Sequence, residues 1–182
     1  NMGKEKVDKN IIANALGNIG LVYYKQGNYK ETVTFYNRTL KIKKEIGDKR
    51  GIASTLINIA NVYVEQENFN NALKYYEKSL KINEDLGHKA NIATSLTGIG
   101  YIHFSKGNDS VAINYYNRSL KINEEIGDEM GIAGAMSNIA LIYEKQKKYE
   151  QAINNYEICL KICEEFDAKH WISYTLYNIG KL

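Results

Sequence analysis

The stretch LKIKKEIGD at residues 40–48 decides the fold, because the chain repeats it at a spacing of 40 residues. It returns as LKINEDLGH at residues 80–88 and as LKINEEIGD at residues 120–128. Isoleucines keep the same register along the chain, at Ile12, Ile52, Ile92, Ile132 and Ile172. A period between about 20 and 50 residues is typical of a solenoid, in which each repeat buries its apolar face against its neighbours. The period therefore favours a protein that holds another molecule over one that transforms it.

Within one repeat, the apolar residues have helical spacing. Leu56, Ile59, Ala60 and Tyr63 follow the i, i+3, i+4, i+7 pattern of one helix face, and a second helical pattern begins after residues 66–68. Each repeat is therefore expected to be a pair of helices. The chain contains no proline, so no helix is forcibly broken.

Turn and capping residues separate the predicted helices. Residues 26–28 end in Gly-Asn, a pair that tolerates the left-handed backbone of a tight turn. The second helix of each repeat is expected to end at a capping glycine, namely Gly47, Gly87 or Gly127. Asp48 and Asp128 come next and are expected to accept hydrogen bonds from the free amides that open the following helix.

The period divides the chain into repeats of one solenoid domain. The expected segments are a lead-in at 1–11, repeats at 12–51, 52–91, 92–131 and 132–171, and a partial fifth repeat or capping helix at 172–182. Gly20, Ala60, Gly100 and Ala140 share one slot within the predicted first helices. The restriction to very small residues predicts that a neighbouring helix backbone comes close there.

Composition limits the location and the chemistry. No run of about 18 apolar residues exists, and residues 1–10 lack the apolar core of a signal peptide. Two cysteines, Cys159 and Cys163, without a third ligand nearby make a poor zinc site and favour a reducing compartment. A cytoplasmic location is expected, with an extracytoplasmic sensor domain as the alternative. Residues 1–51 hold 11 Lys and Arg against 5 Asp and Glu, which we interpret as a solvated helix surface.

The residues at these positions resemble a known family. The first repeat carries Leu16, Ile19, Gly20, Tyr23, Gly27, Tyr29, Thr32 and Tyr36, and the same pattern returns in the next three repeats. This pattern resembles the signature of the tetratricopeptide repeat. The 40-residue unit is longer than the usual one and resembles the long-helix arrays of kinesin light chains and of bacterial signalling proteins. The resemblance implies an all-α, right-handed α-solenoid of antiparallel helical hairpins that serves as a protein-interaction scaffold.

In the family, the first helices line a concave groove that binds a peptide or a helix. The resemblance therefore implies ligand-groove residues at Asn18, Tyr24, Asn58, Asn61, Tyr101, Phe104, Asn138, Leu141, Tyr177 and Asn178. Four of these asparagines are separated by multiples of 40. A primary amide offers both a donor and an acceptor, so such a row could hold the backbone of an extended ligand. The alternative is that each asparagine bonds an adjacent helix or water.

Other functions find less support in the sequence. The three histidines are scattered, so their spacing predicts no catalytic arrangement and we expect no enzyme, no metal and no cofactor. The tyrosines recur at packing positions and no basic stripe accompanies them, so nucleic-acid binding is not expected. Two alternatives to a peptide-binding scaffold stay open. One is a homo-oligomer formed end to end, and the other is the peptide-sensing domain of a larger bacterial signalling protein.

Overall fold

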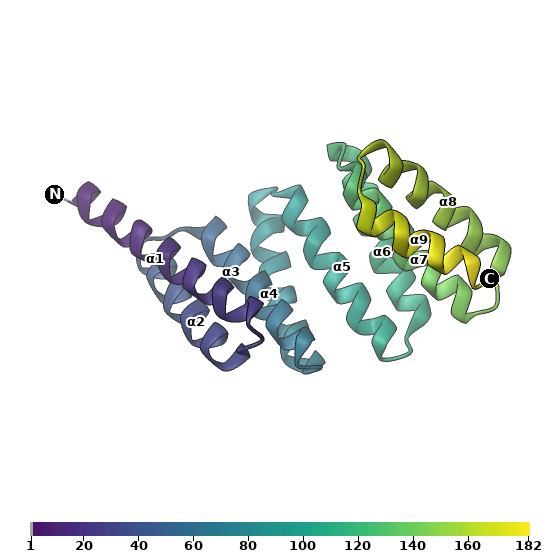
Figure 1. The fold of residues 1–182 in the computed structure, drawn as a ribbon. Helices are drawn as coiled ribbons and strands as arrows, with labels where there is room; N and C mark the ends of the chain where they lie inside the picture. Colours follow the sequence, from purple (N-terminus) through teal and green to yellow (C-terminus); the bar gives the residue numbers. More distant parts are fainter. Residues whose placement is uncertain (1) are drawn as a thin grey trace. The chain divides into compact units, whose positions relative to one another are not determined.

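The structure is a computed structural model that describes residues 2–182, and helices are the only regular elements in that part of the chain. Figure 1 shows them in order: α1 (Met2–Lys25), α2 (Tyr29–Glu45), α3 (Lys49–Glu65), α4 (Phe69–Leu86), α5 (Lys89–Ser105), α6 (Asp109–Ile126), α7 (Glu129–Lys145), α8 (Tyr149–Glu165) and α9 (Lys169–Gly180). Among these described helices, none has the length and apolar character that crossing a bilayer requires.

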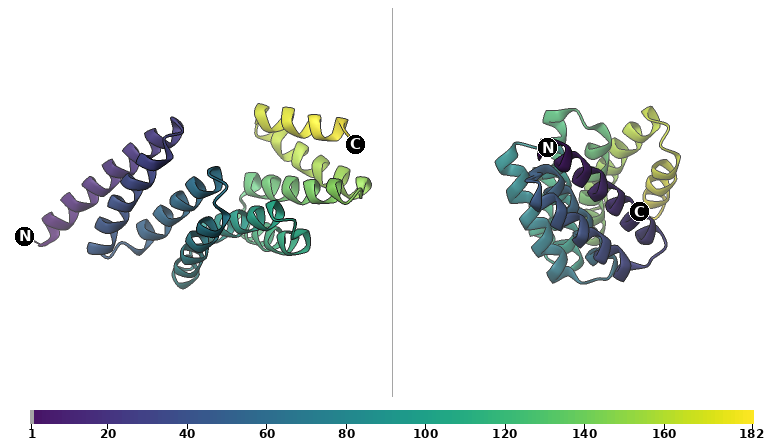
Figure 2. Two further views of the ribbon diagram at one scale, coloured as in Figure 1. Left: turned by 90° about the horizontal axis from the view of Figure 1, so that it is seen from below. Right: turned by 90° about the vertical axis from the view of Figure 1, so that its left-hand side faces the viewer.

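The helices form antiparallel hairpins, as the sequence predicts. Figure 2 shows α1 and α2 running side by side in opposite directions. The chain divides into two compact units, Asn1–Asn91 and Ile92–Leu182. The first unit holds the hairpins α1/α2 and α3/α4, and the second holds α6 to α9 with most of α5. The first helices α3, α5, α7 and α9 each begin three residues before a predicted repeat boundary, and the boundaries themselves stay a prediction.

The predicted capping chemistry is confirmed at the ends of the second helices. Gly47, Gly87 and Gly127 all have positive φ, between 64° and 71°. The Asp48 carboxylate then accepts a hydrogen bond of 2.9 Å from the backbone N–H of Gly51 and so caps α3. Asp128 caps α7 through an equivalent 2.9 Å bond from the Gly131 N–H. These bonds satisfy amide donors that a helix start would otherwise leave unpaired.

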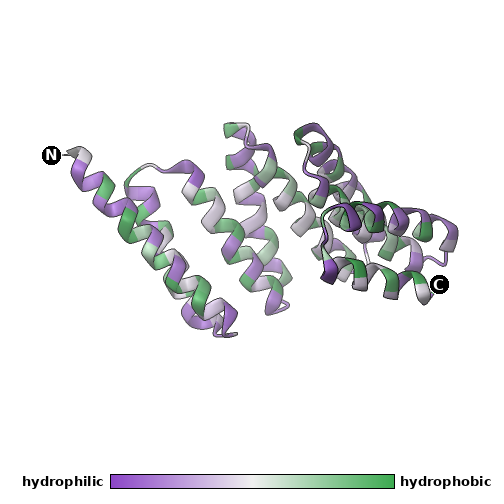
Figure 3. Cartoon of the chain, turned by 45° about the horizontal axis from the view of Figure 1, so that its top comes forward, coloured by the Kyte–Doolittle hydropathy of each residue, from purple (hydrophilic) through white to green (hydrophobic). Residues whose placement is uncertain are grey.

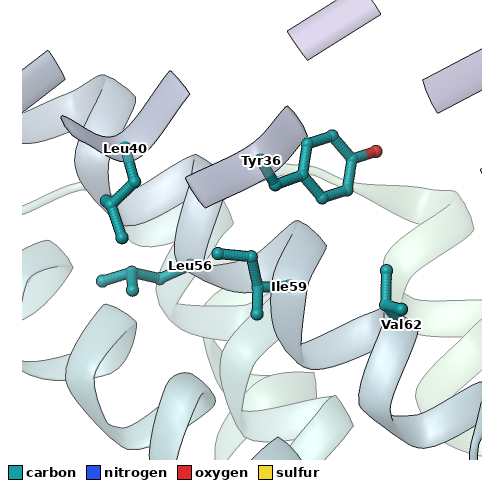
Figure 4. Packing of buried hydrophobic residues seen from close by; sticks show 5 residues of the cluster. All are labelled: Tyr36, Leu40, Leu56, Ile59 and Val62. Carbon is teal, nitrogen blue, oxygen red and sulfur yellow. The ribbon is translucent and has the colours of Figure 1, made fainter. Parts of the chain in front are cut away.

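The core of the first unit lies between α2 and α3. Figure 4 shows Tyr36 and Leu40 on α2 facing Leu56, Ile59 and Val62 on α3. All five side chains are at most 8% exposed. Burying a large apolar side chain stabilises a fold by roughly 1.5–3 kcal/mol, so this cluster is a main source of cohesion between the two hairpins of the unit.

The second unit repeats this packing with its own residues. Ala112 and Tyr116 on α6 meet Ile139 and Ile142 on α7. Figure 3 shows hydrophobic and hydrophilic residues alternating along the helices, and α3 and α7 each pack against both the helix before and the helix after them. The pattern is that of amphipathic helices whose apolar stripe faces a neighbour.

A tyrosine ring, and not a helix backbone, explains the small-residue slot. A Cβ atom added to Gly20 would lie 2.8 Å from the ring of Tyr36, and one added to Gly100 would lie 2.7 Å from the ring of Tyr116. The prediction of a close backbone is therefore wrong. The ring comes from the second helix of the same hairpin, and it fills the space that glycine leaves.

Candidate functional site

The first unit has a hollow between its two first helices, α1 and α3, which we call the first-helix hollow. Its volume is about 370 Å³. Asn14, Gly17 and Asn18 from α1 and Ser54 and Asn58 from α3 form its walls. The floor comes from α2, through Tyr36, Thr39 and Lys43. The hollow is of the size and mixed polarity expected of a site for a few ligand side chains.

The asparagines of the walls are available to a ligand. The side chains of Asn18 and Asn58 are exposed, and neither makes a hydrogen bond to another residue in the described part of the chain. A Cβ atom added to Gly17 would come no nearer than 3.8 Å to Thr39, so glycine leaves room beside Asn18. Two amides that each carry a free donor and a free acceptor thus border an open floor.

The floor holds a buried cation, the Lys43 ammonium, whose hydrogen-bond donors all have partners. Lys43 is 7% exposed, and its Nζ donates to Asn10 Oδ1 at 2.7 Å, Asp48 Oδ2 at 2.9 Å and Asn14 Oδ1 at 3.0 Å. Burial alone would raise the pKa of the Asp48 carboxyl, but the Gly51 N–H and the Lys43 ammonium outweigh it and lower the pKa. Because all three ammonium hydrogens are engaged, Lys43 organises the floor and offers no free charge to a ligand.

Tyr24 and Asn61 are also held by partners in the first unit. The Tyr24 hydroxyl donates to the Glu65 carboxylate at 3.3 Å. Burial, and next the charge of Glu65, raise the pKa of Tyr24 to about 12. Asn61 accepts a short hydrogen bond from the Tyr76 hydroxyl. These two predicted groove residues therefore connect helices, in contrast to Asn18 and Asn58.

The second unit has a smaller hollow between α7 and α9. Its volume is about 230 Å³, and the lining residues are Ser137, Asn138, His170, Trp171 and Tyr174. Asn138 is partly exposed and makes no hydrogen bond within residues 2–182. The predicted groove residue Asn138 thus lies beside the exposed rings of Tyr174 and Trp171, and no sequence pattern pointed to Trp171.

The other predicted groove residues of the second unit differ in how far their side chains are exposed to solvent. Tyr101 is 43% exposed and Tyr177 is 67% exposed. The ring of Phe104 is partly buried, with Lys145 Nζ 5.3 Å from its centroid. Leu141 is partly buried against the cluster of Tyr156. Of these four residues, the two tyrosines are the exposed ones.

Asn178 is buried, unlike the other three asparagines at its repeat position. It is only 2% exposed, and its Nδ2 has no hydrogen-bond partner among the described residues. It lies three residues after Thr175, whose hydroxyl is 3.5 Å from Cys159 Sγ on α8. Because this face of α9 packs against α8, the Asn178 side chain is covered and does not reach a groove surface, contrary to its predicted place among the ligand contacts.

The two cysteines are buried on α8 as free thiols. Their Sγ atoms are 3.9 Å apart, one helical turn from each other. Burial, and next the proximity of Cys159, raise the pKa of the Cys163 thiol to about 11. Within residues 2–182, no group of three potential metal ligands comes together around them or elsewhere.

Sequence reasoning missed the floor of the first-helix hollow. Lys43 has the counterparts Asn83, Asn123 and Cys163, and all four side chains are buried. A polar residue that recurs at one register position among apolar neighbours was the available signal. That signal indicates a polar slot, but not the two asparagines, Asn10 and Asn14, that accept hydrogen bonds from Lys43.

Comparison with known proteins supports the fold. The family described as tetratricopeptide repeat matches residues 11–85, 51–125 and 131–182. No curated protein matches the sequence. Among solved structures, BtubC (BKLC) from P. vanneervenii is similar with a TM-score of 0.82 and 18% identity, over 96% of this chain and 73% of that one.

Two further structures are similar over smaller parts of their own length. Aspartyl phosphate phosphatase F from Bacillus subtilis gives a TM-score of 0.86 at 16% identity, over 92% of this chain and 44% of that chain. A signal transduction ATPase with numerous domains from Pyrococcus horikoshii, which has a tetratricopeptide repeat sensor, gives 0.80 at 20% identity. The similarity covers 92% of this chain but 26% of that protein. The predicted all-α solenoid of helical hairpins is confirmed.

Proposed function

The chain belongs to the tetratricopeptide repeat family, and we propose that it is a non-catalytic protein-interaction scaffold that binds an extended peptide segment on its first helices. The observation that carries the proposal is the pair of unengaged amides, Asn18 and Asn58, on opposite walls of the first-helix hollow. An extended peptide carries one donor and one acceptor per residue along its backbone. Two such amides can hold that backbone without selecting its side chains.

The rest of the hollow would then supply selectivity. The space between Gly17 on the wall and Thr39 on the floor accepts a side chain of the ligand, and Leu21, which is 44% exposed, adds an apolar wall. Lys43 holds Asn10 and Asn14 in place below it. In the second unit, Asn138 together with Trp171 and Tyr174 offers a further amide beside aromatic surface. Each unit thereby offers ligand contacts of its own.

The test compares two double variants of the intact chain. Peptides are selected from a displayed random library on the unmodified protein, and their affinities are then measured by titration. Asn18→Ala with Asn58→Ala removes the two amides of the hollow. Asn114→Ala with Asn154→Ala is the matched control, since both residues are exposed asparagines on second helices.

The two double variants should differ clearly in their affinity for the selected peptides. Losing two hydrogen bonds, each with a net value of roughly 0.5–1.5 kcal/mol, is expected to weaken binding about tenfold in the hollow variant and to leave the control unchanged. Equal affinities of the two variants, or a library that yields no binding peptide, would contradict the proposal. Circular dichroism of both variants checks that the helices stay intact.

A second candidate function, self-association, is favoured by the outer face of α1. Ile19 is 41% exposed, whereas its counterparts Ile59 and Ile139 are at most 4% exposed. Val22 is 54% exposed, and Val62 at the same position of α3 is fully covered. A second copy could supply the missing cover. Sedimentation equilibrium should then show dimers that Ile19→Glu with Val22→Glu abolishes, and a monomer at high concentration would exclude this function.

A further inference from the structure

The first unit has a second groove, on the side of its second helices. We call it the second-helix groove; α2 and α4 form its walls and α3 forms its floor. Its volume is about 480 Å³. Leu40, Leu56 and Ile82 give it an apolar lining, and Figure 4 shows Leu40 of α2 above Leu56 of α3. This groove shares no lining residue with the first-helix hollow.

The rim of the second-helix groove is cationic. Lys44 stands on the α2 wall, and Lys78 and Lys81 stand on the α4 wall. All three side chains are exposed, and none forms an ion pair with another residue of the described chain. No acidic residue is among those that line the groove. Three positive charges without an ion-pair partner therefore stand on two sides of an apolar floor.

The second unit shows that the fold does not require these charges. At positions 80 residues later, Glu124 takes the place of Lys44, Ile158 that of Lys78, and Lys161 that of Lys81. The net charge of these three positions falls from three positive to neutral, while the same helical hairpins form. A helix surface that needed lysines only for solvation would not explain why they gather around the groove of one unit.

From this charge and shape, we propose that the second-helix groove is a docking site for an acidic peptide segment. A bulky apolar side chain of that segment lies on Leu40 and Leu56, and carboxylates on either side of it meet the lysines of both walls. Apolar contact gives such a site its affinity, while charge complementarity orients the partner and speeds its arrival. The site is separate from the peptide surface of the first helices.

Other anionic ligands fit the groove less well. A single fatty-acid carboxylate could pair with one wall, whereas the lysines stand on two. A nucleic-acid base would need a free ring to stack on, but Tyr75, the aromatic residue of the groove, stacks on Tyr63 at 5.5 Å and has Lys78 Nζ 5.8 Å from its centroid. A peptide with carboxylates spaced along its length can reach both walls.

The test uses a blocked peptide with a central leucine flanked on each side by glutamates, titrated into the intact protein at low ionic strength. The groove variant is Lys44→Gln, Lys78→Gln and Lys81→Gln. The control variant is Lys30→Gln, Lys41→Gln and Lys74→Gln, which removes the same charge from exposed positions of the same two helices outside the groove. Two further peptides replace the leucine by serine or the glutamates by glutamine.

We expect the leucine–glutamate peptide to bind the unmodified protein saturably. Its affinity should be about tenfold weaker for the groove variant and within about twofold of the unmodified protein for the control variant, since each exposed ion pair contributes modestly. Both altered peptides should bind more weakly than the parent. Equal loss in the two variants, or no saturation at millimolar peptide, would overturn the proposal. So would binding of phosphatidylserine vesicles or single-stranded DNA to these lysines in place of the peptide. Asn18→Ala with Asn58→Ala should leave this binding unchanged, which separates it from the proposed function.

Discussion

At the scale of single residues, three turn positions within residues 2–182 carry a left-handed backbone without glycine. Glu67, Lys147 and Asp167 have φ of 54°, 59° and 47°. Gly27, at the repeat position of Glu67, has φ of 71°. Glu67→Gly should therefore raise the free energy of unfolding by roughly 0.5–1 kcal/mol, because a side chain at positive φ is strained and glycine is not. Urea unfolding measures the change, and Gly27→Ala should shift stability in the opposite direction.

Ionisation of the Asp48 carboxyl makes the free energy of unfolding depend on pH in the acid range. The folded state lowers the pKa of this carboxyl below its ordinary value of 3.8, so folding favours the ionised form. Its contribution is therefore fully present above that value and is lost as the pH falls through the lower, folded pKa. Between neutral pH and strong acid, the free energy of unfolding should fall less for Asp48→Asn than for the unmodified chain. Identical profiles would assign the acid sensitivity to other carboxyls.

At the scale of helices, two glycines should respond in opposite ways to alanine. A Cβ atom added to Gly134 in α7 would meet open space, so Gly134→Ala should stabilise the protein by about 1 kcal/mol through helix propensity. Gly100 in α5 lies against the buried Tyr116 ring. There the same change should destabilise by about 1–3 kcal/mol, because overpacking exceeds the propensity gain. Thermal unfolding of the two variants provides the comparison.

The sequence predicts the helices well but their contacts only in part. Period and spacing place the hairpins, and glycine followed by aspartate identifies the junction at Gly47 and Asp48, because these signals are local. The partner of Gly20 could not be read in this way, since the Tyr36 ring that fills the space arrives from another helix. Asn178 shares its repeat position with exposed asparagines, yet it is buried by packing specific to the last helix.

At the scale of the whole molecule, damage to the core should remain within one unit. Repeat proteins gain their stability from contacts between neighbours, so an opening event in one part need not open the rest. Ile59→Ala removes a fully buried side chain from the first unit and should cost about 2–5 kcal/mol. Hydrogen exchange should then lose protection chiefly in residues 2–91. Ile142→Ala should give the converse pattern, and a uniform loss from either would indicate one cooperative fold.

The buried thiols give the chain a chemical reporter of its own. Cys159 and Cys163 are its only cysteines, and both lie on α8. Burial raises the pKa of the Cys163 thiol to about 11, so this thiol is protonated at neutral pH, and the thiolate is the form that alkylating reagents attack. Alkylation therefore proceeds mainly when α8 separates from its neighbours. The rate of labelling would time that separation directly, with no engineered probe.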